Sequence, residues 1–311
     1  MSPAKLLLGI DGGGSKTVAF IASIDESNKP SILGKGLSGP SNIRAIGIEE
    51  ATRNLENAMD LAFADAGIPQ QTFESACFGM AGADRPSEID MLQNWVADAQ
   101  ISKRIQIVND ALPVLYSICT KGTGIALICG TGSFAFGQDP NGQTARSGGW
   151  GHLLGDEGSG YWIALEGLKR AVQFADGRGA NTILLNLFLN HFEITESQEL
   201  IPILYSDSID RRDIAQLSKI VFDAAKQQDE VAIGILEQAG RELVRLIESV
   251  DSKLSLSNPT RIGTVGGVIL NSPSLWDLIS AQLEHQNPGR FKLEAVDEPA
   301  IGAIQIAFNS L

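Results

Sequence analysis

The sequence has few of the residues that would cross-link a fold or anchor it in a membrane. Its three cysteines, Cys77, Cys119 and Cys129, form no C-x-x-C pair, so neither a zinc site nor a disulfide framework is predicted. No apolar run approaches the roughly 18 residues of a membrane-spanning helix. The apolar run at residues 6–10 is too short for the core of a signal peptide, because Asp11 ends it. We therefore expect a cytoplasmic protein without a membrane partner.

Basic residues are also scarce. The 311 residues include 24 Lys and Arg against 37 Asp and Glu, which gives a net charge of −13. This balance argues against a nucleic-acid partner, because a phosphate backbone needs a basic surface. It does not exclude a small anionic ligand, since a local group of backbone amides binds phosphate whatever the global charge. A hydrophobic content of 43% and a length sufficient for two domains indicate an ordinary globular protein.

The first informative feature is a glycine turn between two apolar strands, at residues 6–10 and 18–24. Strand, turn and strand form a hairpin, and its glycines let backbone amides approach a ligand without obstruction by Cβ atoms. Such a turn can hold a polyphosphate, while Asp11 can hold Mg²⁺ through water. By itself the motif fits a ligand-free turn equally well. The predicted nucleotide-binding residues here are Asp11, Gly12, Gly13, Gly14, Ser15, Lys16 and Thr17.

A second glycine turn follows the apolar strand at residues 124–129 and has another apolar strand after it. Its predicted phosphate-binding residues are Gly130, Thr131, Gly132 and Ser133. Two such hairpins, each opening its own half of the chain, indicate a duplicated domain with a nucleotide between the halves. This architecture resembles the superfamily of actin, Hsp70 and the sugar kinases.

The expected order of elements extends this interpretation. In each half, hairpin-like strands precede alternating helices and strands, which is the ribonuclease H-like order. We therefore expect an α/β fold of two duplicated ribonuclease H-like domains, the actin-like ATPase fold, with a nucleotide cleft between them. The first domain is predicted at residues 1–119, joined by a terminal helix within 298–311. The second is predicted at 120–297, with a helical insertion at about 180–251 that includes one long helix over 211–227.

Asp110 is the candidate catalytic base. It comes directly after an apolar strand expected at residues 104–108 and before a helix expected at 111–119. Ligands collect at the carboxyl ends of strands in open α/β sheets, and a carboxylate there can accept a proton from an attacking hydroxyl. The alternative role is an N-cap aspartate, which is common at such junctions.

The loop at residues 147–160 is dense in glycine and combines Trp150, His152, Asp156 and Glu157. This composition suits sugar recognition, with apolar surface for the ring and carboxylates for pairs of hydroxyls. The alternatives are mere packing for Trp150 and a solvated capping pair for Asp156 and Glu157. His152 is interpreted as a structural hydrogen-bonding residue rather than an acid–base catalyst, since no second histidine lies nearby.

A third glycine motif follows the strand expected at residues 261–265. Gly266, Gly267 and Asn271 would let an adenine or ribose lie against the backbone. An ordinary strand-to-helix turn is the alternative.

Together these motifs resemble the amino-sugar kinases, which include N-acetylglucosamine kinases, bacterial glucosamine kinases and the wider BadF/BadG/BcrA/BcrD ATPase family. The resemblance covers nearly the whole chain and is most specific at residues 148–162. It implies that the two glycine turns are phosphate motifs and that Gly266, Gly267 and Asn271 belong to an adenosine motif. It also implies that residues 298–303 connect the terminal helix to the first domain. The implied sugar contacts are Asn42, Asp110, Gly149, Trp150, Gly151 and Asp156.

The activity implied by the resemblance is transfer of the γ-phosphate of Mg-ATP to the 6-hydroxyl of N-acetylglucosamine, with Asp110 as the base. Free glucosamine is the alternative substrate, because the segment around Asn42 is closer to bacterial members and Phe134 replaces a polar residue of the animal enzymes. Two other hypotheses are an iron–sulfur activator of a radical dehydratase and a sugar sensor that does not phosphorylate. A homodimer is implied by the resemblance alone.

Overall fold

The chain folds into two compact units. The computed structural model describes residues 5–82 and 86–311. The first unit comprises residues 1–126 and 296–311, and the second comprises residues 127–295; the sequence analysis placed these boundaries at 119/120 and 297/298. Within the described residues, no helix is both long enough and apolar enough to cross a membrane.

The first unit is built on a five-stranded sheet with the strand order β3-β2-β1-β4-β5. Its strands are β1 (Leu6–Gly12), β2 (Thr17–Ile24), β3 (Pro30–Ser38), β4 (Ser75–Met80) and β5 (Ile105–Asn109). The central strand β1 pairs antiparallel with β2 and parallel with β4, which in turn pairs parallel with β5. The β1–β2 hairpin expected around the first glycine turn is therefore confirmed.

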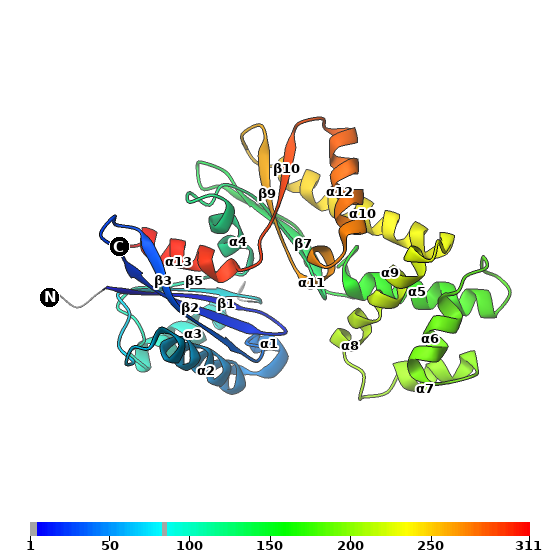
Figure 1. The fold of residues 1–311 in the computed structure, drawn as a ribbon, viewed down its shortest axis with the longest axis horizontal. Helices are drawn as coiled ribbons and strands as arrows, with labels where there is room; N and C mark the ends of the chain where they lie inside the picture. The colour runs from blue at the N-terminus through cyan, green and yellow to red at the C-terminus, as the bar shows by residue number, and fades with distance from the viewer. Residues whose placement is uncertain (1–4, 83–85) are drawn as a thin grey trace. The chain divides into compact units, whose positions relative to one another are not determined.

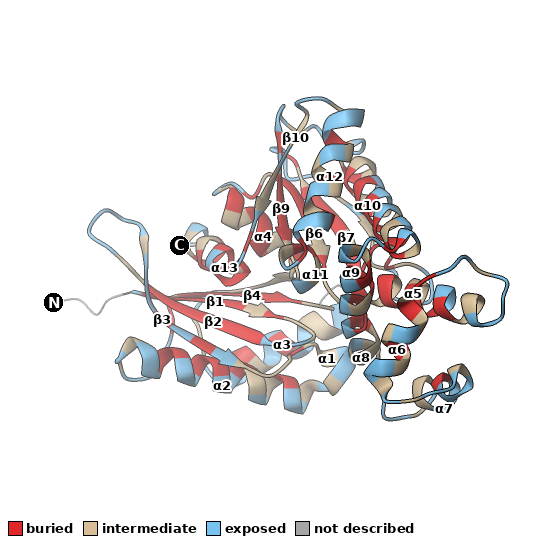
Figure 2. Ribbon diagram, turned by 45° about the vertical axis from the view of Figure 1, so that its right-hand side comes forward, coloured by how far each residue is buried: buried red, intermediate tan, exposed pale blue. Residues whose placement is uncertain are grey.

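Helices cover both faces of this sheet, and they are labelled in Figure 1. One face packs against α2 (Ile48–Ala66) and α3 (Pro86–Asp98), and the other packs against α4 (Ala111–Ile118) and α13 (Pro299–Asn309). Because side chains alternate along a strand, Leu8 of β1 contributes to the first core and Leu7 to the second. In Figure 2, β1 and β4 are buried along most of their length, whereas α2 has buried residues on one side and exposed residues on the other. A short helix, α1 (Ile43–Ile46), follows β3 and was not expected.

The second unit repeats the arrangement. Its strands are β6 (Gly124–Cys129), β7 (Ser133–Gln138), β8 (Thr144–Gly148), β9 (Thr260–Val265) and β10 (Phe291–Ala295). The sheet order is β10-β9-β6-β7-β8. Counted within each unit, both sheets have the strand order third, second, first, fourth, fifth. The predicted duplication of a ribonuclease H-like domain is therefore confirmed.

Most of the helices of the second unit lie between β8 and β9. The insertion is helical, as expected, and its longest helix, α10, packs against β7, β8 and α12. The helices and the one 3₁₀ turn are α5 (Gly160–Ala175), α6 (Leu184–Phe192), η1 (Ser197–Glu199), α7 (Leu200–Leu204), α8 (Arg211–Gln216), α9 (Ser218–Lys226), α10 (Glu230–Asp251), α11 (Gly267–Leu270) and α12 (Pro273–Gln286).

The single helix expected over residues 211–227 is wrong, because the chain breaks at Leu217 into α8 and α9. At the break, the amide of Leu217 donates to the carbonyl of Ile214 three residues earlier at 3.0 Å. The hydroxyl of Ser218 donates to the carbonyl of Ala215 at 2.7 Å. Such local bonds compete with the regular helical pattern. α8 packs against α5.

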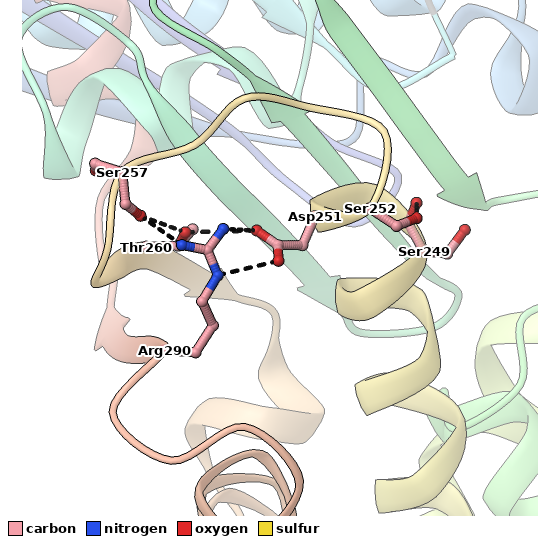
Figure 3. A network of polar contacts seen from close by, with 6 residues as sticks. All are labelled: Ser249, Asp251, Ser252, Ser257, Thr260 and Arg290. Carbon is pink, nitrogen blue, oxygen red and sulfur yellow. Dashed lines mark hydrogen bonds and ion pairs between the residues drawn. The ribbon is translucent and has the colours of Figure 1, made fainter.

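A polar network joins the end of α10 to the starts of β9 and β10 (Figure 3). Arg290 lies just before β10 and forms a two-pronged ion pair with Asp251 at the end of α10, at 2.6 and 3.1 Å. Its guanidinium also donates to the carbonyl of Ser257 at 3.0 Å, and the Thr260 hydroxyl donates to the same carbonyl at 2.8 Å. The network thus ties the last turn of α10 to the start of β9 and β10.

Candidate functional site

The first glycine turn is a tight hairpin between β1 and β2. The amide of Gly13 donates to the carbonyl of Lys16 at 2.9 Å, which closes the turn. A Cβ atom on Gly12 would lie 2.5 Å from the Met80 sulfur, so side chains inside the unit pack closely against the backbone there. A Cβ atom on Gly14 would meet no described atom within 4 Å. Packing within the described protein therefore does not require glycine at position 14, whereas close approach of a ligand to the backbone would.

The sheet register brings the two predicted acidic residues of the first unit to one edge. Gly12 at the end of β1 pairs with Met80, and Met80 pairs with Asn109 at the end of β5. Because these three strands are parallel, their carboxyl ends lie together. Asp11 and Asp110 are therefore neighbours, although about a hundred residues of sequence separate them. At this edge of the sheet the negative charge of Asp110 acts on Asp11.

The pKa of Asp11 is raised to about 7. Burial is the main cause, because it disfavours the charged carboxylate, and the negative charge of Asp110 is the next. Lys16 opposes the shift, while Glu298, at the start of α13, adds to it. Glu298 is itself held by an ion pair with Lys35 on β3. Asp11 thus lies where negative charge accumulates at the edge of the sheet.

Asp110 does not act as a capping residue. It occupies the N-cap position of α4, but its side chain accepts no capping hydrogen bond. The neighbouring Asn109 does this instead: its Oδ1 accepts from the amides of Ala111 and Leu112, at 3.1 and 3.0 Å. The alternative of an N-cap aspartate is therefore wrong. A carboxylate at the end of a strand, which its helix does not need as a cap, suits the predicted role of a base.

Two further residues predicted from sequence have internal roles in the first unit. Thr17 is fully buried, and its hydroxyl donates to the carbonyl of Gly39 at 2.7 Å and contacts the Ser41 hydroxyl at 2.8 Å. It anchors the chain after β3, and its contact with a nucleotide stays a prediction. Asn42 caps the short α1, since its Oδ1 accepts from the amide of Arg44 at 3.1 Å. Its sugar contact also stays a prediction.

The first unit has residues that suit a magnesium ion bound mainly through water. Among the described residues, no group of three or more His, Cys, Asp and Glu side chains is placed to hold a metal ion. Mg²⁺ does not need such a group, because it keeps several waters and is usually held by one or two carboxylates and by phosphate oxygens. Burial is the main cause of the raised pKa of Asp11, and a cation relieves the second cause, the repulsion from nearby carboxylates. The residues therefore fit Mg²⁺ held through water, and the role of Asp11 in holding it stays a prediction.

The second glycine turn is joined closely to the loop that precedes α5. The amide of Gly160 donates to the carbonyl of Gly130 at 2.9 Å, and the amide of Gly149 donates to the carbonyl of Ser133 at 3.1 Å. The buried hydroxyl of Ser133 donates to the carbonyl of Glu157 at 2.7 Å. Turn and loop, which the sequence analysis treated as separate phosphate and sugar motifs, thus form one assembly.

The loop presents apolar side chains to solvent. Trp150 is 74% exposed, and Leu153 and Leu154 are more exposed still. Packing therefore does not account for Trp150, and its sugar contact stays a prediction. His152 packs edge-on against Tyr161, with ring centres 5.1 Å apart, and its side chain forms no hydrogen bond within the described residues. The expectation of a hydrogen-bonding His152 is therefore replaced by a packing role.

Asp156 is a buried residue of the loop, and both of its carboxylate oxygens have partners. It is only 3% exposed, so the alternative of a solvated capping residue is wrong. Its Oδ1 accepts from the amide of Ser133 at 3.3 Å, and its Oδ2 forms an ion pair with Arg211 of α8. Its backbone has a φ of 63°, in the left-handed region that few residues other than glycine adopt. The surrounding contacts therefore hold this carboxylate against local strain.

The third glycine motif lies beside the second. A Cβ atom on Gly266 would lie 2.9 Å from the Gly130 nitrogen, and the φ of Gly266 is 116°, so only glycine fits there. Asn271 donates from Nδ2 to the carbonyl of Gly267 at 2.8 Å and so stabilises the short α11. The structure thus brings the predicted phosphate and adenosine motifs of the second unit together, because β9 and β6 are neighbours in the sheet.

Comparison with known proteins assigns a family. The model of the BadF/BadG/BcrA/BcrD ATPase family matches residues 8–307. The chain belongs to this family. A curated relative from Clostridium acetobutylicum, an N-acetylmuramic acid/N-acetylglucosamine kinase, is 35% identical over 97% of this chain and 98% of its own length. A second, the N-acetyl-D-glucosamine kinase of Dictyostelium discoideum, is 33% identical over 98% of each chain.

A solved structure supports the fold. The crystal structure of a candidate N-acetylglucosamine kinase from Chromobacterium violaceum matches with a TM-score of 0.76 and covers 98% of this chain and 99% of its own. Its sequence identity is 22%, so this likeness supports the fold alone. Membership of an ATPase family implies that the protein uses ATP. The expectation that both glycine turns bind one nucleotide stays a prediction.

Four residues were not predicted as site residues from the sequence: Asn109, Arg211, Lys35 and Glu298. Arg211 lies in the helical insertion, more than fifty residues after its partner Asp156. Lys35 and Glu298 are farther apart still, and they pair because β3 and α13 lie on the same unit. Only the capping role of Asn109 had a local signal, because asparagine is as favoured at helix starts as aspartate.

Proposed function

We propose that this protein is an amino-sugar kinase that transfers the γ-phosphoryl group of ATP to the 6-hydroxyl of N-acetylglucosamine. The observation that carries the proposal is the acidic edge of the first unit, where Asp110 lies beside Asp11 and leaves helix capping to Asn109. The full-length similarity to two curated N-acetylglucosamine kinases supports the choice of substrate. Glucosamine is the alternative substrate, and the Clostridium relative adds N-acetylmuramic acid as a third sugar to test.

In the proposed reaction, Asp110 accepts the proton of the sugar hydroxyl, and the amides of the glycine turns contact the phosphates. Mg²⁺, when bound, neutralises charge on the transferred phosphoryl group. Asp11 would hold this ion through water, and Lys16, exposed on the turn, would add positive charge near the phosphates. Trp150 would supply an apolar face for the sugar ring, since its indole is largely exposed.

Asp156 completes the proposed sugar site. A buried carboxylate with one oxygen on a backbone amide and the other on a guanidinium keeps a fixed direction. Carboxylates held in this way can accept hydrogen bonds from a pair of sugar hydroxyls. Which sugar hydroxyls donate to Asp156 depends on the substrate, and this assignment is part of the proposal.

The role of an iron–sulfur activator is not favoured. Cys77 and Cys129 are both buried in strands. Burial raises the pKa of each thiol, that of Cys129 to about 12. A thiolate is the form that binds iron, so these two residues are poorly suited to hold a cluster.

The test is ATP turnover with a panel of hexoses that includes N-acetylglucosamine, glucosamine, N-acetylmuramic acid and glucose, followed by the variant Asp110→Asn. The wild-type protein should phosphorylate N-acetylglucosamine. The variant should still bind sugar and nucleotide but turn over at least ~100-fold more slowly, because the base is lost. Asparagine keeps the shape of the side chain, and Asn109 still caps α4, so folding should be unchanged. Turnover close to that of the wild type would remove Asp110 from the proposed role.

Three finer statements belong to the same proposal. The Mg²⁺ requirement is tested by turnover in excess chelator, which should abolish activity. A homodimer is tested by light scattering of the purified chain. A cytoplasmic location is expected because the reaction consumes ATP.

A further inference from the structure

Arg211 is a cation of the helical insertion that lies against the second glycine turn. It is the first residue of α8, and its guanidinium pairs with Asp156. A terminal guanidinium nitrogen lies 2.7 Å from where a Cβ atom on Gly132 would stand, so the side chain rests directly on the turn. The guanidinium also lies 5.9 Å from the centre of the Tyr161 ring. Arg211 therefore contacts the turn, the loop and the start of α5 at once.

The start of α8 is fixed by its own capping contacts. The side chain of Asp210 accepts from the amides of Arg212 and Asp213, at 2.6 and 3.0 Å. In return, the Asp213 carboxylate accepts from the amide of Asp210 at 2.8 Å. This reciprocal arrangement is a capping box, which sets where a helix begins and how it enters. The position of Arg211 is therefore built into the backbone of the insertion and does not depend on a flexible loop.

The ion pair with Asp156 does not use all the hydrogen-bond donors of the Arg211 guanidinium. Its side chain is 36% exposed, whereas that of Asp156 is 4% exposed. The Nε of Arg211 is buried and has no hydrogen-bond partner within the described part of the chain. A buried donor left in this way has a cost. The arrangement is therefore poorly explained as a contact made for stability, and better explained as one made to direct the carboxylate.

We propose that Arg211 is a positioning residue for the sugar, which holds the Asp156 carboxylate in the direction that accepts the sugar hydroxyls. The helical insertion then takes part in substrate recognition through one side chain. This inference rests on the proposed function, because it assigns Asp156 to the sugar. Loss of Arg211 should therefore weaken the binding of the sugar and leave the binding of the nucleotide unchanged.

The experiment compares Arg211→Met, Arg211→Lys and the control Arg212→Met. Arg212 is the next residue of α8 and pairs with Asp210 at the surface, at 3.0 Å, away from Asp156. The Met variant at position 211 should raise the KM for N-acetylglucosamine about 10- to 100-fold, as expected for one charge-assisted hydrogen bond. The KM for ATP should change less than about 3-fold. The Lys variant should be intermediate, because it keeps the charge but not the planar fork. Arg212→Met should match the wild type.

A double variant separates positioning from general damage to the fold. With Asp156→Asn already present, Arg211→Met should raise the sugar KM by no more than about 2-fold, because its partner is gone. Titration calorimetry with N-acetylglucosamine and, separately, with Mg-ADP checks the same split without turnover. A rise in the KM for ATP in place of the sugar KM would show that Arg211 binds phosphate, and would overturn the inference.

The outcomes also separate this inference from the proposed function. If the wild-type protein phosphorylates an amino sugar and Arg211→Met leaves its KM unchanged, the inference fails alone. If the wild type neither binds nor phosphorylates any sugar of the panel, the proposed function fails and the inference fails with it.

Discussion

Replacing Gly302 by alanine should destabilise the first unit, because α13 lies too close to α4 for a methyl group. A Cβ atom there would lie 2.6 Å from the Ser117 hydroxyl and 2.8 Å from the carbonyl carbon of Pro113, and it would overlap the Pro113 carbonyl oxygen. Real Cβ atoms essentially never approach closer than 3.0 Å. The carbonyl belongs to a helix backbone, so it cannot rotate away. The two helices must therefore separate by roughly 1 Å in a close-packed interior.

The expected size follows from two opposing effects. Overpacking of a core costs about 1–3 kcal/mol, and a clash with backbone lies at the upper end. Alanine is a better helix former than glycine by about 0.5–1 kcal/mol, which offsets part of the cost. The net loss should be about 2 kcal/mol. The matched control is Gly234→Ala in α10, where an added Cβ atom meets no described atom within 4 Å. That change should stabilise the protein by a few tenths to about 1 kcal/mol.

Urea unfolding measures the change in the free energy of unfolding for both variants. Hydrogen exchange of peptides from α4 and α13 shows where Gly302→Ala destabilises the protein. Exchange in those two helices should rise in Gly302→Ala and stay unchanged in Gly234→Ala. Gly302→Ala should also slow catalysis, because α4 begins directly after Asp110 and a shift of about 1 Å can cost up to ~100-fold in rate. A free energy of unfolding within about 0.5 kcal/mol of the wild type would refute the reasoning.

Two further predictions concern charge. Because Asp11 has a pKa of about 7, it is largely protonated below that pH, and Mg-nucleotide binding should strengthen as the pH rises from 6 to 8. Asp110→Asn should move the midpoint of this rise to lower pH in calorimetric titrations, since one cause of the shift is removed; a flat profile would contradict the assignment. In the second unit, Asp251→Asn should lower the free energy of unfolding by roughly 1–2 kcal/mol, because it weakens a partly buried two-pronged pair with Arg290. Hydrogen exchange should rise near the end of α10, and a uniform change over the chain would count against this account.

Much of this protein was determined by its sequence at short range. The two hairpins follow from apolar strands around glycine turns. Each depends on neighbours in the chain, so a local pattern suffices to predict it. The duplication follows as well, because the same pattern occurs twice. The resemblance of residues 148–162 to sugar kinases pointed to the family before any geometry was known.

Tertiary structure alone decided what these residues touch. Asp11 and Asp110 are neighbours because β1, β4 and β5 end at one edge of a parallel sheet. Arg211 reaches Asp156 because α8 packs against α5. A one-dimensional pattern reports which side chains share a face. It does not report which distant charge will meet a buried carboxylate, because that depends on how separate elements pack.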